Sequence, residues 1–411
     1  MFSNGSHHPK LLTKLFAALL STLIAGASLF VAVSTALAAT DVPEVKAEAY
    51  IVADFVTGRI LASKNTDIPH IPASLTKIMS MYVIFDAISA GEISMDDMVE
   101  VSELAWATEG SKMYILVGTE VKVEDLIKGV TVMSGNDACV ALAEHVAGNV
   151  TSFVDRMNHK ARELGLTSAH FVDPHGLSDD NQISAEDLVT LVSSYVLVHP
   201  EALPYHALKE FAYTAPGESQ KAPQFNRNRL LWSYPGTYGL KTGFTTKAGF
   251  NMVALCERSG FHIIVVVLGS AKGKSIDAGE RERTALVTSL LDWAYGNYSY
   301  VEKAAPDTVI DRVRVWKGKG KWVEAIAPYG LGATVEKGNE DKLVYSVILS
   351  DTVEAPVQAG QKVGEAVFSI DGEEIGRMDL LAKTTVPKGN FFRVLWDSVV
   401  RALSRAFSRQ E

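Results

Sequence analysis

Three short motifs in the sequence bring together the hydroxyl and amine groups that nucleophilic catalysis requires. In chain order they are Ser74-Leu75-Thr76-Lys77, Ser134-Gly135-Asn136 and Lys241-Thr242-Gly243. A serine hydroxyl is a weak nucleophile until a neighbouring base takes its proton, and an uncharged lysine amine is such a base. Each motif alone arises often by chance, but the three together indicate a site that reacts through a serine.

The first motif supplies the nucleophile and its base. Ser74 is predicted to open a buried helix that runs to about Ala90, where backbone N–H groups and the positive end of the helix dipole would stabilise an oxyanion. Lys77 lies one turn along the same face. Burial and a second cation, for which Lys241 is the candidate, would lower the pKa of the Lys77 amine. The alternative is an N-cap serine followed by a surface lysine, which the surrounding apolar residues disfavour.

The second motif can relay a proton and bind a substrate amide. Ser134 lies between two predicted helices, where its hydroxyl can pass a proton between Lys77 and a leaving amine. Asn136 carries an amide that can hold a substrate carbonyl. The alternative is an ordinary turn in which Gly135 supplies a positive φ.

The third motif is predicted to be a strand that binds an extended peptide. A substrate could pair antiparallel to it, with its carboxylate held by Lys241 and Thr242. Gly243 has no side chain and would let the substrate backbone approach closely. The alternative is an edge strand that simply ends at glycine.

The pattern around these motifs predicts an α+β domain. Residues 49–62 have the pattern of a hairpin around Thr57-Gly58. Further strands and helices are expected at these ranges: strands at 239–242, 249–256 and 262–268, and helices within 122–147 and at 152–165, 184–198 and 280–295. Strands at both ends with helices between them indicate one mixed sheet with a helical insert.

Beyond about Asp311 the sequence changes to short β-rich segments divided by Gly, Asp and Lys, which predicts a small all-β domain. The stretch KGKGK at 317–321 resembles a polyanion-binding loop, but between strands of an acidic protein it is interpreted as a solvated hairpin turn.

The last segment predicts an amphipathic helix. One face carries Phe392, Leu395, Val399, Leu403 and Phe407, joined by Trp396, Val400 and Ala406. The other face carries Arg401, Arg405 and Arg409 at four-residue spacing after Asp397. We expect residues 391–411 to lie on a membrane surface. The alternative is a helix packed on the β domain.

The N-terminus has the order of a secretory signal. Lys10 and Lys14 precede an apolar run from Leu15 to Phe30, and Ala36-Leu37-Ala38 follows. Cleavage after Ala38 is expected, with an uncleaved anchor as the alternative. We therefore expect four parts: a signal peptide at 1–38, a catalytic domain at 39–300, a β domain at 301–388 and a terminal helix at 389–411.

Composition and residue types argue against several classes of partner and cofactor. The formal net charge of −9 makes nucleic acid a poor candidate partner. No HExxH or Cys/His cluster suggests a metal, and no cofactor is expected. Cys139 and Cys256 lie far apart on apolar stretches and are interpreted as buried unpaired thiols, with a disulfide left open.

The segments PASLTKIM, SGNDACVALAEH, PHGL and GLKTGFTTKAGFNMVA resemble the low-molecular-mass penicillin-binding DD-carboxypeptidases, in the branch with a β domain and a C-terminal amphipathic anchor. The resemblance spans the chain from about Ala49 onward. It implies a penicillin-recognising transpeptidase/β-lactamase-like fold in which Ser74 is acylated by the D-Ala-D-Ala end of a peptidoglycan pentapeptide. β-Lactam antibiotics would bind covalently at the same serine. The expected location is the periplasmic face of the bacterial inner membrane, as a peripheral protein.

The resemblance also implies roles for three further groups. The backbone N–H groups of Ser74 and Phe244 would form the oxyanion hole. Arg283 would help to recognise the substrate carboxylate. Many relatives carry His where this chain has Phe244, so only the backbone role carries over at that position.

Three rival functions remain open. A class A-like β-lactamase would need S-D-N and a glutamate that aims the deacylating water; here the middle motif is S-G-N, and Glu186 is interpreted as helix capping. A hydrolase built on His175 and Asp173 lacks a G-x-S-x-G elbow. A non-catalytic cell-wall scaffolding module would leave the three intact motifs unexplained.

Overall fold

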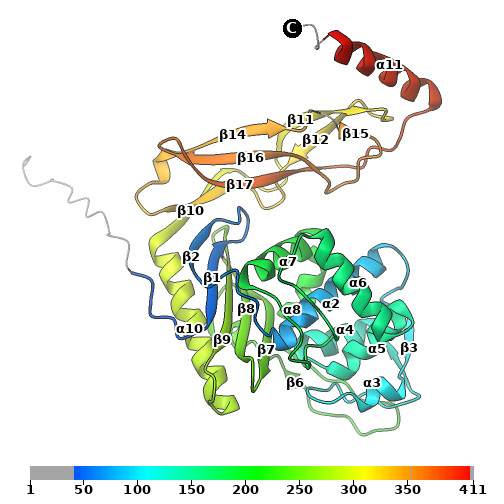
Figure 1. Ribbon diagram of the computed structural model, residues 1–411, viewed down its shortest axis with the longest axis vertical. Helices are drawn as coiled ribbons and strands as arrows, with labels where there is room; N and C mark the ends of the chain where they lie inside the picture. Colours follow the sequence, from blue (N-terminus) through cyan, green and yellow to red (C-terminus); the bar gives the residue numbers. More distant parts are fainter. Residues whose placement is uncertain (1–40, 352, 408–411) are drawn as a thin grey trace, which may run out of the picture. The chain divides into compact units, whose positions relative to one another are not determined.

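The computed structural model describes residues 41–351 and 353–407. The chain from Thr40 onward forms one compact unit, in which an N-terminal α+β region is followed by a β-rich region and a last helix (Figure 1). The expected signal peptide, residues 1–38, lies outside the described residues, and the expected domain boundaries remain predictions.

A five-stranded sheet with the order β2-β1-β9-β8-β7 forms the centre of the α+β region. Its strands are β1 Ala49–Asp54, β2 Ile60–Lys64, β7 Thr237–Thr245, β8 Gly249–Arg258 and β9 Phe261–Ser270. The predicted fold class is confirmed, but the sheet is antiparallel in every pairing rather than mixed. Each neighbouring pair either joins through a short turn or, for β1 and β9, brings the two ends of the region together.

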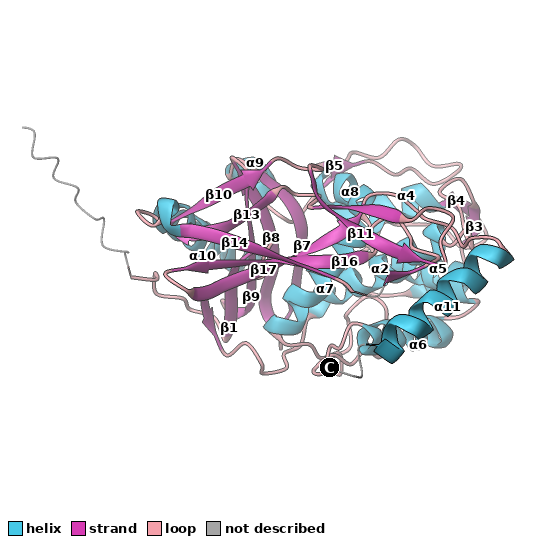
Figure 2. Ribbon diagram, turned by 90° about the horizontal axis from the view of Figure 1, so that it is seen from above, coloured by secondary structure: helices cyan, strands magenta, loops and turns pink. Residues whose placement is uncertain are grey.

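Helices cover both faces of this sheet (Figures 1 and 2). The insert between β2 and β7 supplies η1 Ala73–Thr76, α2 Lys77–Ser89, α3 Glu103–Ala107, α4 Val123–Val132, α5 Asn136–Ala147, α6 Val150–Glu163, α7 Ala185–Val198, η2 Pro200–Ala202, α8 Leu203–Ala207 and α9 Leu230–Ser233. It also contains two short ribbons, β3 Met98–Glu100 with β4 Glu120–Lys122, and β5 Glu210–Phe211 with β6 Gln224–Phe225. On the other face lies α10 Ile276–Asn297.

Alternation along the strands divides the core between these two layers. In β1, Ile51 joins the core beneath the insert helices, whereas Val52 joins the core beneath α10. In β9, Val266 and Val265 divide in the same way. Because successive side chains of a strand point to opposite faces, a strand that is apolar throughout is buried on both sides.

The helix predicted from Ser74 is confirmed, with one refinement at its start. Ser74 lies in the 3₁₀ turn η1, and the α-helix α2 begins at Lys77. Gly91, at φ +71°, follows the end of α2. Helix α2 is apolar nearly all round because it packs against α5, α6 and α7.

The β-rich region has its own core and a six-stranded sheet with the order β14-β16-β17-β12-β11-β15. Its strands are β11 Val309–Trp316, β12 Trp322–Ile326, β14 Leu343–Leu349, β15 Val353–Glu354, β16 Lys362–Ile370 and β17 Glu373–Ala382; the 3₁₀ turn η3 is Glu340–Lys342, and β10 Tyr298–Ala304 pairs with β13 Leu331–Glu336. The stretch 317–321 joins β11 to β12, which pair antiparallel, so the predicted hairpin turn is confirmed.

The last helix, α11 Phe391–Phe407, contacts the β-rich region through its charged face. Asp397 is 2% exposed, and its carboxylate accepts a hydrogen bond of 2.7 Å from the backbone N–H of Lys317. Arg401 forms an ion pair of 2.8 Å with Glu354. No helix among the described residues is long and apolar enough to cross a bilayer.

Burial in the β-rich core predicts unequal effects for two aromatic residues that face each other across β14 and β16. Phe368 is fully buried and pairs with Tyr345, which is 44% exposed. We expect Phe368→Ala to lower the free energy of unfolding of this region by about 3–5 kcal/mol. The matched control Tyr345→Ala should cost much less, because that ring is largely in water. Urea unfolding of both variants measures the difference, and equal losses would contradict the core assignment.

Candidate active site

The three predicted motifs meet in one cleft. Its volume is about 70 Å³, and it is lined by Ser74, Ser111, Ser134, Arg227, Thr242, Gly243, Phe244, Phe250, Ile276, Glu280 and Arg283. Most of these residues come from η1, from the loop between α4 and α5, from the edge strand β7 and from α10; Ser111 lies between α3 and β4, Arg227 between β6 and α9, and Phe250 on β8. Segments far apart in the sequence are therefore brought together at one cleft.

Ser74 and Lys77 lie within hydrogen-bond distance of each other. The ammonium or amine nitrogen Nζ of Lys77 is 3.1 Å from Ser74 Oγ. Two oxygens hold the same nitrogen: Asn136 Oδ1 at 2.6 Å and the backbone carbonyl of His175 at 2.7 Å. The position of Nζ is thus fixed by these two oxygens, and its third hydrogen bond is made with the hydroxyl of Ser74.

The surroundings of Lys77 make its amine easier to deprotonate. The side chain is fully buried, and burial lowers the pKa of Lys77 to about 8. Arg227 lowers this pKa further by charge repulsion, against the opposing effects of Cys139 and Asp173. Arg227 is thus a cation near Lys77 that was not predicted; Lys241, for which that role was predicted, is also close enough for the charges of the two lysines to repel each other.

Ser134 forms a second hydroxyl–amine pair with Lys241. The Lys241 Nζ donates to Ser134 Oγ at 2.9 Å and to the backbone carbonyl of Thr242 at 3.0 Å. Burial, and then repulsion from Lys77, place the pKa of Lys241 well below its usual value. The two lysines therefore disfavour each other's charged form, although each is bonded to a different serine.

The backbone around Ser134 differs from the expected turn. Ser134 itself has φ +58°, whereas Gly135 has φ −57°. A Cβ at Gly135 would lie 2.9 Å from the Asp137 carboxylate and 3.1 Å from the backbone nitrogen of Met113. Gly135 is thus required for space and not for a positive φ. The strained residue is the serine that carries the functional hydroxyl.

Asn136 holds Lys77 and the neighbouring loop together. Its Oδ1 accepts from Lys77, and its Nδ2 donates to the backbone carbonyl of Glu109 at 2.7 Å. A Cβ at Gly110 would lie 2.6 Å from that Nδ2, so the loop touches the amide closely. Both ends of the amide, predicted to bind substrate, are engaged within the protein here.

Gly243 brings strand β7 against the start of η1. A Cβ at this position would lie 2.7 Å from the carbonyl oxygen of Pro72 and 3.1 Å from the backbone nitrogen of Ser74. Gly243 thus has no room for a side chain because it packs against η1, and its predicted role in admitting the substrate backbone stays a prediction. The next residue, Phe244, stacks on Phe250 with ring centroids 4.3 Å apart and is 38% exposed at the cleft.

The loop that follows α6 contacts Lys77 through a backbone carbonyl. Asp173 accepts hydrogen bonds from the backbone N–H groups of His175, Gly176 and Ser178. A Cβ at Gly176 would collide with the carbonyl of Ala73. The loop offers a backbone carbonyl to Lys77, and burial lowers the pKa of His175 to about 4. The His175 ring bonds to Asp173 and not to a serine, which argues against the rival Ser-His-Asp site.

Two arginines lie at the cleft, one of them missed by the sequence analysis. Arg283 is 2% exposed, and its guanidinium makes only long hydrogen bonds, of 3.4 Å, to the backbone carbonyls of Asn251 and Arg227. Its Nε has no partner. Burial lowers the pKa of Arg283 to about 10. Arg227 was overlooked because the segment NRNR carries no periodic signal and depends on the fold to reach the cleft.

Other candidate groups take no part in the cleft. Both thiols, Cys139 and Cys256, are free and buried, as predicted; burial raises the pKa of Cys139 to about 11. Glu186 is exposed in the first turn of α7, where the sequence analysis placed it. Among the described residues no group of three or more His, Cys, Asp or Glu could hold a metal ion.

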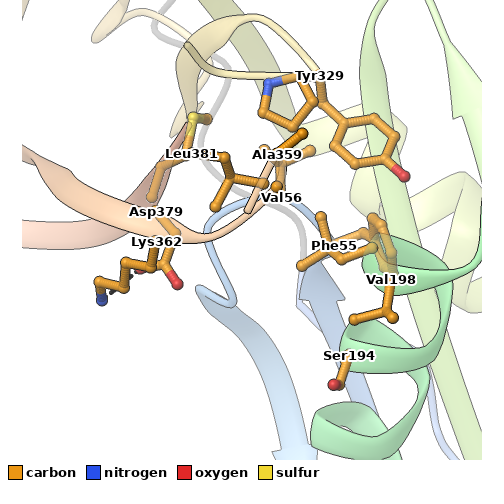
Figure 3. Close-up of a pocket in the computed structure, with 13 residues that line it drawn as sticks. Phe55, Val56, Ser194, Val198, Tyr329, Ala359, Lys362, Asp379 and Leu381 are labelled. Atoms are coloured by element: carbon orange, nitrogen blue, oxygen red, sulfur yellow. Dashed lines mark ion pairs between the residues drawn. The ribbon is translucent and has the colours of Figure 1, made fainter. Parts of the chain in front are cut away.

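A second pocket has a larger volume but lacks a reactive pair. Its volume is about 460 Å³, and apolar side chains such as Val198, Tyr329 and Leu381 line it (Figure 3). Its two charged side chains, Lys362 and Asp379, form an ion pair of 2.5 Å with each other. A site without a nucleophile beside a base does not support the chemistry of the first cleft.

Comparison with known proteins agrees with this assignment. The sequence pattern of a family described as D-alanyl-D-alanine carboxypeptidase matches residues 36–272, and the C-terminal domain of penicillin-binding protein 5 matches residues 298–388. The D-alanyl-D-alanine carboxypeptidase DacC of Escherichia coli is 38% identical over 95% of this chain and 98% of its own. The DacA protein of Haemophilus influenzae is 34% identical over 94% and 99%.

Solved structures give the same result. Penicillin-binding protein 5 of Haemophilus influenzae superposes with a TM-score of 0.66 at 34% identity, covering 85% of this chain and all of that one. Penicillin-binding protein D2 of Listeria monocytogenes, solved in its ampicillin-bound form, has a TM-score of 0.54 at 27% identity over 62% of this chain and all of that one. With a cleft that joins two serine–lysine pairs, and with relatives that match it nearly end to end, the chain belongs to the D-alanyl-D-alanine carboxypeptidase family.

Proposed function

We propose that the protein removes the terminal D-alanine from peptidoglycan stem peptides through an acyl-enzyme on Ser74. The observation that carries this proposal is the pair formed by Ser74 and a buried Lys77 whose Nζ lies 3.1 Å from the hydroxyl. Membership of the family supplies the substrate class. β-Lactams, which such serine enzymes bind covalently, would acylate the same hydroxyl.

In the acylation step Ser74 Oγ attacks the carbonyl carbon of the penultimate D-alanine, and its proton passes to the neutral Lys77 amine. The carbonyl oxygen becomes an oxyanion held by backbone N–H groups of Ser74 and Phe244. The C–N bond then breaks, and the leaving D-alanine amine takes a proton through the Ser134 hydroxyl. In deacylation a water attacks the ester, Lys77 accepts its proton, and the Ser74 oxygen leaves with a proton.

Cationic groups at the cleft bind the substrate carboxylate. Lys241 and Thr242 lie on the edge strand β7, where an extended peptide can add as a further strand. Arg283 is buried at the cleft with an unpaired Nε, and Arg227 lies beside it. A buried guanidinium with few partners gains most from an incoming carboxylate.

We infer that the exported protein rests on the periplasmic face of the inner membrane through α11. Phe392, Leu395, Trp396 and Val399 are all about half exposed or more, while the polar face of the helix is occupied by contacts to the β-rich region. A helix packed on a soluble domain buries its apolar face, so the reverse orientation supports contact with lipid.

The nucleophile can be tested by labelling with a fluorescent penicillin. We expect Ser74→Ala to abolish the covalent label and the release of D-alanine from a pentapeptide, because no other hydroxyl lies beside the Lys77 amine in the described structure. The matched control is Ser111→Ala, which removes a hydroxyl from the same cleft and should leave the label in place. Undiminished labelling of the Ser74 variant would refute the assignment.

The lowered pKa of Lys77 predicts the pH dependence of acylation. Because the neutral amine is the base, the rate constant for acylation by a β-lactam should rise with pH through an apparent pKa of about 8 and then level off. Asn136→Asp puts a carboxylate against Lys77, which raises the pKa of the amine, so the profile should move to higher pH by about one unit or more. Glu186→Gln is the control and should leave the profile unmoved. A rate that falls with rising pH would show that Lys77 is not the base.

The membrane assignment predicts a loss of binding without loss of activity. Phe392→Glu/Trp396→Glu should lower partitioning onto lipid vesicles by roughly a hundredfold or more, since burying each aromatic side chain contributes about 1.5–3 kcal/mol. Deletion of residues 391–411 should abolish binding to neutral vesicles. Penicillin labelling should persist in both proteins. The control Val344→Glu alters an apolar side chain that is 56% exposed elsewhere on the β-rich region; equal losses in this variant would contradict the role of α11.

A further inference from the structure

The turn between β11 and β12 is strongly basic and open to solvent. Residues 317–321 read Lys-Gly-Lys-Gly-Lys, and the side chains of Lys319 and Lys321 are exposed. Within the described residues neither of them forms an ion pair, although 27 such pairs occur there, one of them made by Lys317. Lys317 differs, because its ammonium pairs with Glu354 at 2.5 Å. The turn thus presents two uncompensated positive charges.

Backbone hydrogen bonds join this turn to the segment that immediately precedes α11. The N–H of Gly389 donates to the carbonyl of Lys317 at 2.8 Å, and the N–H of Lys319 donates to the carbonyl of Pro387 at 2.8 Å. The N–H of Lys317 is bonded to the buried carboxylate of Asp397. Figure 2 shows α11 lying across the end of the sheet where β11 finishes. The turn is therefore bonded both to the segment that precedes α11 and to the helix itself.

The strand that leaves the turn begins with an exposed indole. Trp322 is 57% exposed and lies opposite Arg314 on β11. Tryptophan is enriched where an apolar phase meets water, because its ring is apolar and its N–H is polar. The hairpin thus carries an exposed Trp directly after Lys319 and Lys321. The same combination of aromatic and basic side chains occurs in α11.

The acidic groups near the turn are already paired. Glu354 bonds to both Lys317 and Arg401, and Asp397 bonds to Arg393 at 3.2 Å. The chain as a whole is acidic, with a net charge of −9. The turn is therefore a positively charged patch on a negatively charged protein. Such a patch attracts an anionic surface over about one Debye length.

We propose that the turn of residues 317–321, together with Trp322, is a second membrane contact that selects anionic phospholipid headgroups. This inference rests on the proposed membrane role of α11. The helix provides apolar contact with any bilayer, whereas the turn adds affinity only where the surface is negatively charged. Lys319 and Lys321 contact the headgroups, and Trp322 enters the interface beside them.

The test uses the full-length mature protein and two kinds of vesicle, one of phosphatidylcholine alone and one with an equal amount of phosphatidylglycerol. The variant Lys319→Gln/Lys321→Gln should lose about 30-fold in partitioning onto the anionic vesicles, since each lysine contributes about fivefold. It should bind the neutral vesicles as the parent does. Raised salt should abolish the difference between parent and variant. Trp322→Ser should weaken binding to both vesicles.

The matched control is Lys46→Gln/Lys303→Gln, which removes two other exposed lysines that form no ion pair in the described structure. Equal losses in this control would mean that only net charge matters, and would overturn the proposal. Unchanged binding of Lys319→Gln/Lys321→Gln to anionic vesicles would overturn it as well. Deletion of 391–411 separates the two hypotheses: if it leaves neutral-vesicle binding intact, the role of α11 fails, whatever the turn does.

Discussion

The catalytic domain depends on a lysine amine that has been withdrawn from water. Removing an ammonium group from water costs several kcal/mol unless other groups compensate. Around Lys77 the hydrogen-bonding partners replace only part of this lost hydration energy. Two oxygen atoms and one hydroxyl satisfy the nitrogen as a hydrogen-bonding group. They do not supply a full negative charge, so the neutral amine remains accessible at a pKa of about 8. A carboxylate in place of the Asn136 amide would stabilise the charged form of Lys77 and move the reaction to higher pH.

The rest of the fold is arranged to keep this environment fixed. The apolar helix α2 carries the lysine into the interior, α5 begins with the amide that binds it, and the loop after α6 contributes a carbonyl. The second lysine, Lys241, lies on the edge strand β7 and donates a hydrogen bond to Ser134. Because the charged forms of Lys77 and Lys241 repel each other, a proton gained at one position makes a proton at the other less stable. This coupling suits a reaction in which a proton is taken up and then released at the leaving group.

The parts of the site that follow from local periodicity could be predicted from the sequence. Ser74 and Lys77 are three residues apart on a helix, so their proximity needs no knowledge of the tertiary fold. The joining of three motifs was predictable as a pattern, and so was the hairpin at 317–321. Contacts between residues far apart in the sequence could not be predicted from these local patterns. Arg227 reaches the cleft only through the fold, and the polar face of α11 is held by the backbone N–H of Lys317, 80 residues away. The antiparallel sheet likewise depends on which strands become neighbours, and a single sequence does not encode that directly.

The left-handed backbone at Ser134 has a consequence for how the enzyme can change. Ala73 at φ +50° and Tyr114 at φ +67° adopt the same region, and each such residue costs of order 1 kcal/mol. Glycine at these positions would relieve that cost. At position 134, however, glycine would also delete the hydroxyl bonded to Lys241. Stability and activity therefore oppose each other at this residue: selection for a more heat-resistant enzyme can improve the sheet, the helices and the β-rich region, but must leave the strained serine as it is.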